Sequence, residues 1–353
     1  MFDAEVDDQL DTFPAVGAIY VAGIGCETHP SMSRTHRITW YARGDGQAGK
    51  SMREYRTAVF DNRRWQGFKP RPDDIFVCTP AKCGTTWTQA IIASLLYPNG
   101  DAPASVNTLS PWIEAKFIPA DEMHEALEAQ TQRRFMKSHT AADGIPWFDD
   151  AKYIVVGRDG RDVFMSMCNH LQRMKRIAEM NERALADGVP PMPEFDGDFH
   201  AFFPTWLSQD DILFHIIETY WQRREQPNVL LVHFQDLKSD LEGEMRRIAE
   251  FLDIEFDAAL WPAVVERCTF DGMRGRAEEI GEFDRMFEGG IEGFLFKGTN
   301  GRWRDVLTDE EVAAYERRVS EMLPEAAARW LEGGRHALPA QPLGVEQVGS
   351  GDH

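Results

Sequence analysis

The most informative part of this chain reads Asp74-Asp-Ile-Phe-Val-Cys-Thr-Pro-Ala-Lys82-Cys-Gly84-Thr85-Thr86-Trp87. Its apolar residues 75–77 favour a β-strand, and Pro80 ends that strand because proline cannot donate a hydrogen bond to a neighbouring strand. From residue 88 to residue 97, apolar side chains recur at helical spacing. The sequence therefore predicts a strand, a tight polar turn and a helix.

The turn is predicted to bind an anion. It enters the helix through Gly84, Thr85 and Thr86, so free backbone N–H groups face a ligand at the positive end of the helix dipole. Lys82 adds a positive charge. A Walker-type P-loop needs its lysine directly after the second glycine, whereas Lys82 precedes Gly84 here. We expect a P-loop-like loop that does not hold a triphosphate with its magnesium. The simpler alternative is that Gly-Thr-Thr only caps a helix.

Two later segments carry polar residues to the same region. Residues 151–157 form a second predicted strand, which is followed by Arg158 and, roughly two helical turns later, by Ser166. Ligands of open α/β sheets bind at the carboxyl ends of the strands. Lys137 and His139 lie on one side of a short predicted strand, because side chains alternate along it. These residues are candidates for one binding site.

A glycine-rich basic loop at residues 293–303 completes a resemblance to one known family. The order Thr-x-x-Lys-x-Gly-Thr-Thr-Trp, Lys-x-His, Arg-x-x-x-Asp-x-x-x-Ser and Lys-Gly-x-x-Gly-x-Trp is similar to that of the cytosolic-type sulfotransferases. Those enzymes take a sulfuryl group from 3′-phosphoadenosine 5′-phosphosulfate (PAPS) and release adenosine 3′,5′-bisphosphate (PAP). We expect an α/β fold with a mainly parallel central sheet, helices on both faces and a P-loop-like phosphosulfate-binding loop.

The resemblance assigns catalytic roles to three residues of this chain. His139 matches the general base that takes the proton of the acceptor hydroxyl. Lys82 and Lys137 match lysines that stabilise charge on the transferred group and on the leaving phosphate. Sulfuryl transfer, like phosphoryl transfer, depends mainly on such positioning and charge neutralisation.

The resemblance also implies a complete site for the donor. Residues 82–87 match the loop around the phosphosulfate and the aromatic residue on the adenine, and the later residues match contacts to the adenine and the 3′-phosphate. The full set is Lys82, Cys83, Gly84, Thr85, Thr86, Trp87, Arg158, Ser166, Phe234, Thr269, Phe270, Lys297 and Gly298.

The chain departs from the family pattern at four positions. Cys83 stands where serine is usual, so a side-chain hydroxyl is lost while the backbone N–H remains. Phe234 stands where tyrosine commonly contacts the adenine, and Phe296 stands where an arginine often contacts the 3′-phosphate. Asp309 occupies an apolar position of the short dimer motif, so dimerisation by that route is not expected.

Two other functions compete with this interpretation. A nucleotide-dependent kinase needs a carboxylate for magnesium, for which Asp236 is the candidate, but the position of Lys82 argues against it. A non-catalytic binder of PAPS or PAP does not need Lys137 and His139, which are both present. No metal is expected, because PAP is a good leaving group and the five cysteines have no metal-ligand spacing.

Composition limits the partners and the compartment. The chain has 353 residues and a net charge of −20, so a nucleic-acid backbone is not an expected partner. Five scattered cysteines give no disulfide framework, and the chain shows neither a signal peptide nor an apolar run near the ~20 residues of a membrane span. A cytoplasmic protein is therefore expected.

The domain expectation is a single sulfotransferase domain at residues 61–335, with an insertion at 181–209. An N-terminal extension of uncertain structure (1–60) and a disordered tail (336–353) flank it.

The acceptor is expected to be a small molecule or lipid with one reactive hydroxyl: a phenol, a sterol-like alcohol or a lipid. The insertion fits either an acceptor-pocket wall or a surface loop anchored by aromatic residues. Aromatic residues that fit an apolar pocket are Trp112, Phe117, Trp147, Phe148, Phe199, Phe202, Phe203 and Trp206.

Overall fold

A four-stranded parallel sheet forms the centre of the computed structural model, which describes residues 37–38, 52–209 and 212–338. The strands are β3 (Ile75–Cys78), β4 (Phe135–Ser138), β5 (Lys152–Gly157) and β6 (Val229–His233), in the order β4-β3-β5-β6. All neighbouring pairs in this sheet are parallel, which confirms the expected sheet. A small antiparallel pair joins β1 (Arg37–Ile38) to β2 (Met52–Arg53).

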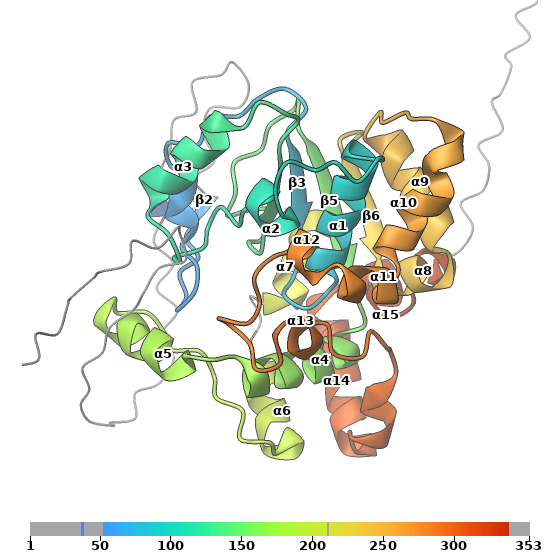
Figure 1. Ribbon diagram of the computed structural model, residues 1–353. Coiled ribbons are helices and arrows are strands. Elements are labelled where there is room, and N and C mark those ends of the chain that lie inside the picture. The colour runs from blue at the N-terminus through green and yellow to red at the C-terminus, as the bar shows by residue number, and fades with distance from the viewer. Residues whose placement is uncertain (1–36, 39–51, 210–211, 339–353) are drawn as a thin grey trace, which may run out of the picture.

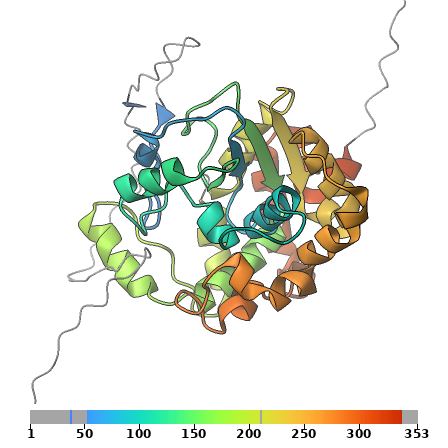
Figure 2. The same cartoon turned by 45° about the horizontal axis from the view of Figure 1, so that its top comes forward.

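Helices cover both faces of the sheet (Figures 1 and 2). Side chains alternate along β3, so Ile75 and Val77 enter one hydrophobic cluster while Phe76 and Cys78 enter another. The first cluster includes residues of α1 (Thr85–Leu96), α9 (Leu241–Phe251) and α10 (Trp261–Cys268). The second includes residues of α7 (Phe214–Trp221). The predicted α/β architecture is therefore confirmed.

The remaining helices surround this frame. A third hydrophobic cluster joins α7 to helices at residues 160–173, 199–207, 309–322 and 325–333. The helices not yet given are α2 (Val106–Leu109), α3 (Ala120–Ala129), α4 (Gly160–Arg173), α5 (Ile177–Ala186), α6 (Phe199–Leu207), α8 (Phe234–Ser239), α11 (Phe270–Gly275), α12 (Ala277–Ile280), α13 (Gly290–Phe294), α14 (Asp309–Met322) and α15 (Glu325–Gly333). Short 3₁₀ helices are η1 (Asn62–Trp65), η3 (Ala258–Leu260), η4 (Arg302–Asp305) and η5 (Arg335–Ala337).

Aromatic side chains anchor the segment predicted as an insertion. Phe202, Phe203 and Trp206 of α6 are buried, and their rings lie 6.1, 5.1 and 5.3 Å from the ring of Phe164 on α4. Large buried rings of this kind stabilise packing strongly. These three residues therefore hold α6 against α4.

The ends of the chain differ in part from the expected boundaries. Tyr55 is buried and its backbone N–H donates to Asn62 Oδ1 at 2.8 Å, so packing begins before residue 61. Ordered structure continues through η5 to residue 338. Most of the predicted extension and residues 339–353 of the predicted tail lie outside the described residues. Within the described part of the chain, no helix has the length and apolar character needed to cross a membrane.

Candidate functional site

The loop between β3 and α1 is shaped to hold an anion. Lys82 and Gly84 have φ angles of +70° and +110°, which turn the backbone sharply before the helix. No side chain caps α1 at Gly84, so the first N–H groups of the helix remain for a ligand. A Cβ atom at Gly84 would lie 3.0 Å from Cδ2 of Phe234. The loop therefore needs glycine here for both its backbone conformation and this close approach.

His139 is held in the tautomer that suits a general base. Its Nδ1 lies 2.7 Å from the carbonyl oxygen of Thr79. A carbonyl can only accept a hydrogen bond, so Nδ1 carries the proton and Nε2 is the free acceptor in the neutral ring. The Thr79 hydroxyl lies 3.2 Å from His139 Nδ1 and 2.6 Å from the Thr85 hydroxyl, which links His139 to the start of α1. Burial, reinforced by the charge of Lys137, lowers the pKa of His139 to about 4.

Lys82 points towards His170, a residue without a role in the sequence analysis. The Lys82 Nζ lies 3.1 Å from His170 Nδ1 and 4.6 Å from the centre of the Phe294 ring. Burial, with the charges of Arg158 and Lys137, lowers the pKa of Lys82 to about 7. Burial and the Lys82 charge hold the pKa of His170 well below its usual range, so the neutral ring accepts from Lys82. Ser166 and His170 are four residues apart and so lie on one face of α4. This spacing is the sequence signal that could have indicated His170.

Arg158 joins the first loop to the late basic loop. Its guanidinium group donates to the carbonyl oxygens of Lys82 (3.1 Å) and Thr299 (3.2 Å) and to Asn300 Oδ1 (3.0 Å). The same group lies 4.1 Å from the centre of the Phe234 ring. Ser166 lies on α4, which begins just after Arg158. The predicted 3′-phosphate residues Arg158 and Ser166 therefore come from the carboxyl edge of β5.

Aromatic rings and a second close-packed glycine lie next to this arginine. The ring of Trp87 lies 5.2 Å from that of Phe234 at 72°, and its Nε1 donates to the Cys268 carbonyl oxygen at 2.7 Å. Gly298 has a φ angle of +61°, and a Cβ atom there would lie 2.6 Å from Phe270. The predicted adenine residues and the late loop are therefore brought together.

Two predicted donor residues have side chains that are engaged elsewhere, and a third has an exposed side chain. The Cys83 side chain is buried among apolar residues, which raises its pKa to about 12, so only its backbone faces the loop. The Thr269 hydroxyl accepts from Gly272 N–H and donates to the Glu266 carbonyl, each at 2.9 Å, and so caps α11. Lys297 is exposed and lies over the Phe296 ring at 5.3 Å.

Asp236 is not placed to bind the magnesium ion that the alternative kinase function would need. Its carboxylate is buried and accepts from the backbone N–H of Arg335 at 2.9 Å, where it holds the turn after α15. Among the described residues, no group of three or more His, Cys, Asp or Glu side chains could hold a metal ion. The carboxylate on which the kinase alternative depended thus has a structural task.

The predicted acceptor aromatics divide between two ends of the sheet. Trp112 lies 4.7 Å from the His139 ring, because its segment pairs with Lys137 along the free edge of β4, and Phe117 lies 6.0 Å from Trp112. Trp147 instead stacks on Tyr153 at 3.9 Å near the start of β5, and Phe148 packs beside it. The expectation that Trp147 and Phe148 line the acceptor pocket is wrong, because they cover the opposite end of the core.

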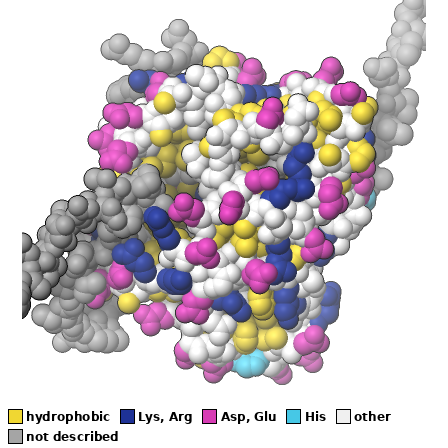
Figure 3. Space-filling model, viewed as in Figure 1, with side chains coloured by type: hydrophobic (Ala, Val, Ile, Leu, Met, Phe, Trp, Pro, Cys, Tyr) yellow, Lys and Arg dark blue, Asp and Glu magenta, His cyan; other side chains and the backbone are white. Residues whose placement is uncertain are grey.

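One face of the molecule carries charges of both signs. Figure 3 shows Lys and Arg side chains gathered where α11, α13 and α14 lie, on a face that also carries many acidic groups.

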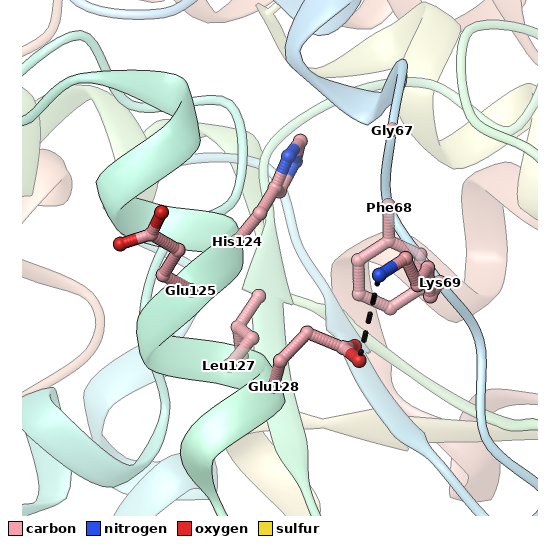
Figure 4. A pocket seen from close by; sticks show the side chains of 7 residues that line it. All are labelled: Gly67, Phe68, Lys69, His124, Glu125, Leu127 and Glu128. Atoms are coloured by element: carbon pink, nitrogen blue, oxygen red, sulfur yellow. Dashed lines mark ion pairs between the residues drawn. The ribbon is translucent and has the colours of Figure 1, made fainter.

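A cavity of about 260 Å³ lies between α3 and residues 67–69, with an ion pair from Lys69 to Glu128 at 4.0 Å (Figure 4). It is lined by none of the predicted site residues.

Comparison with known proteins identifies the class that this fold and site define. The sulfotransferase domain family matches residues 72–326, so the chain belongs to that family. The chain is similar to glycolipid sulfotransferases of Mycobacterium bovis, at 33% identity over 80% of this chain and 94% of the relative. It is also similar to human sulfotransferase 1C2, at 26% identity over 71% of this chain and 83% of the relative.

Solved structures support the fold. Mouse sulfotransferase SULT7A1, solved as a complex with PAP, matches with a TM-score of 0.58 at 20% identity, over 76% of this chain and 90% of that one. Retinol dehydratase, solved in a complex with retinol and PAP, matches with a TM-score of 0.59 at 20% identity, over 78% and 88% of the two chains. The predicted family and fold are both confirmed, and the protein is a sulfotransferase.

Proposed function

We propose that this sulfotransferase moves the sulfuryl group of PAPS to a hydroxyl group of a lipid or another apolar acceptor, with His139 as general base. The observation that carries the proposal is the 2.7 Å hydrogen bond from His139 Nδ1 to the Thr79 carbonyl oxygen. It leaves Nε2 unprotonated in a ring that also lies beside Trp112 and Lys137. A proton acceptor, a positive charge and an apolar surface thus meet at one point.

The reaction follows from these positions. The acceptor oxygen attacks the sulfur of PAPS as its proton passes to His139 Nε2, the new O–S bond forms, and the bond from sulfur to the 5′-phosphate oxygen breaks. PAP leaves with the electron pair. Lys82, Lys137 and the N–H groups at the start of α1 stabilise the negative charge on the transferred group and the leaving phosphate.

Binding of the donor also prepares the base. In the free protein the charges of Lys137 and Lys82 contribute to the low pKa of His139. An anionic donor between these lysines offsets their charge, so the pKa of His139 rises towards the neutral range that suits proton transfer. Donor and acceptor steps are thereby linked through electrostatics.

A lipid acceptor is supported by two independent observations. The mycobacterial relatives are glycolipid sulfotransferases and are matched over 94% of their length. The rings of Trp112 and Phe117 give the base an apolar neighbourhood on the side away from the nucleotide loops. We therefore expect a long apolar acceptor to compete better than a small polar alcohol.

The test is turnover with PAPS in the presence of EDTA, using 2-naphthol and a bacterial glycolipid as acceptors. The proposal expects PAP to be released with both and the sulfated lipid to form without added metal. Activity that disappears with EDTA, returns with magnesium and uses ATP would contradict it and support a kinase.

A further inference from the structure

The ring of Phe296, at the position where the family commonly has an arginine, is surrounded by cations. The charged ends of Arg173, Lys297 and Arg302 lie 4.9, 5.3 and 5.5 Å from its centre. Cations within about 6 Å of an aromatic ring are attracted to its face. The chain has therefore lost the charge at residue 296 itself but has gathered positive charge around it.

Arg302 differs from the other two cations in its hydrogen bonding. Its Nε is buried and has no hydrogen-bond partner among the residues that the structure describes. Arg173 Nε donates to Asn169 Oδ1 at 3.2 Å, and Lys297 is exposed to water. A buried N–H group without an acceptor is unfavourable and rare in folded proteins. This donor is therefore available to an acceptor that a ligand supplies.

The segment beside Arg302 is held by Asp162 and by Arg158, of which Arg158 is a predicted 3′-phosphate residue. The N–H of Gly301 donates to Asp162 Oδ1 at 2.7 Å, and Asn300 accepts from Arg158 at 3.0 Å. Asp162 precedes Ser166 by about one turn of α4. The Asp162 carboxylate also acts on the charges of both Arg158 and Arg302, opposing the effect of burial, which lowers the pKa of each. The Asp162 carboxylate, in the first turn of α4, thus acts on both guanidinium groups.

We propose that Arg302 binds the 3′-phosphate of the donor and supplies the charge that Phe296 lacks. The inference rests on the proposed PAPS-dependent function and adds a residue to it. An arginine suits this task because its planar fork can donate two parallel hydrogen bonds to one phosphate. The Phe296 ring then serves as a support for the guanidinium group.

The experiment compares the affinities of PAP and 5′-AMP, which lacks the 3′-phosphate, for three proteins by calorimetry: the wild type, Arg302→Gln and Arg304→Gln. Arg304 is the matched control, because it lies on the same 3₁₀ helix, is exposed and stacks on Trp303 at 4.7 Å. We expect Arg302→Gln to weaken PAP binding ~10- to 100-fold, the value of a charge-assisted contact. Its 5′-AMP affinity and both affinities of Arg304→Gln should change little.

The outcomes distinguish a failure of the whole proposed 3′-phosphate site from a failure of the role of Arg302 alone. A wild type that binds PAP and 5′-AMP equally would reject the proposed 3′-phosphate site as a whole. A wild type that prefers PAP, combined with an unchanged preference in Arg302→Gln, would overturn only the role of Arg302. If Arg302→Gln does not fold, Arg302→Lys replaces it: loss of the bidentate fork should reduce the PAP preference, and an unchanged preference would overturn the role.

Discussion

The proposed nucleotide half and the proposed acceptor half of the site are built in different ways. The nucleotide half consists of loops whose backbones are fastened to one another: Arg158 donates to Lys82 and Thr299, and Gly301 donates to Asp162. The acceptor half is a set of rings around His139, of which Trp112 is held by strand-like pairing at the sheet edge. A fixed nucleotide half suits one donor, whereas packed rings can be exchanged to suit different acceptors.

The largest expected effect separates the two halves at His139. His139→Ala removes the base, so turnover with PAPS should fall by ~10² to 10⁴. PAP affinity should hardly change, because the nucleotide loops keep their own hydrogen bonds. Single-turnover kinetics and calorimetry on the same preparation measure both quantities. A folded variant that retains most of its turnover with several acceptors would show that His139 is only structural.

The two halves should also respond to pH in different ways, His139 through catalysis and Lys82 through donor affinity. In the free protein His139 has a pKa of about 4 and loses its function as a base when it gains a proton, so kcat/KM for PAPS, which reports the free enzyme, should fall as pH drops through about 4. Lys82, with a pKa of about 7, loses its charge as pH rises, so donor affinity should fall above about 7. Donor binding near neutral pH should accordingly take up a proton, which calorimetry in buffers of different ionisation enthalpy detects. Affinity that stays constant from pH 6 to 9 would contradict the role of Lys82.

A smaller effect is expected from a glycine pair that tests the nucleotide half alone. Gly298 and Gly188 have similar φ angles of +61° and +66°, but a Cβ atom would meet Phe270 at 2.6 Å at the first and nothing within 4 Å at the second. Gly298→Ala should weaken PAP binding about tenfold through displacement of the loop, the equivalent of ~1.4 kcal/mol. Gly188→Ala carries the same backbone strain and should leave PAP binding unchanged. Equal affinities in the two variants would remove the loop from the nucleotide site.

The anion loop of the proposed nucleotide half could be predicted from the sequence because its residues are local. Residues 82–87 lie on one turn and helix start, so their spacing alone indicates an anion loop and its register. Arg158 was predictable because the carboxyl ends of parallel strands meet at one edge. The partners of Arg158 in residues 299–300 were not, since nothing local links segments so far apart in the sequence.

The acceptor half could be predicted only in part. Trp112 and Trp147 are both tryptophans, and composition does not tell which one packs beside His139. Only the pairing of residue 112 along β4 brings its ring to the base. Thr79 belonged to the recognised motif, but its role depends on a carbonyl oxygen, which any residue would have supplied there. Tertiary packing, and not residue type, decides these positions.

The most direct test of the central claim is thermal stabilisation of the wild-type protein by PAP, 5′-AMP and ATP with magnesium. Because Arg158, Ser166 and the 297–302 loop are proposed to bind the 3′-phosphate, PAP should raise the melting temperature far more than the other two. At one hundred times its dissociation constant, PAP should add ~2.7 kcal/mol to the free energy of unfolding. Equal shifts from PAP and 5′-AMP, or the largest shift from ATP with magnesium, would contradict the proposed donor site.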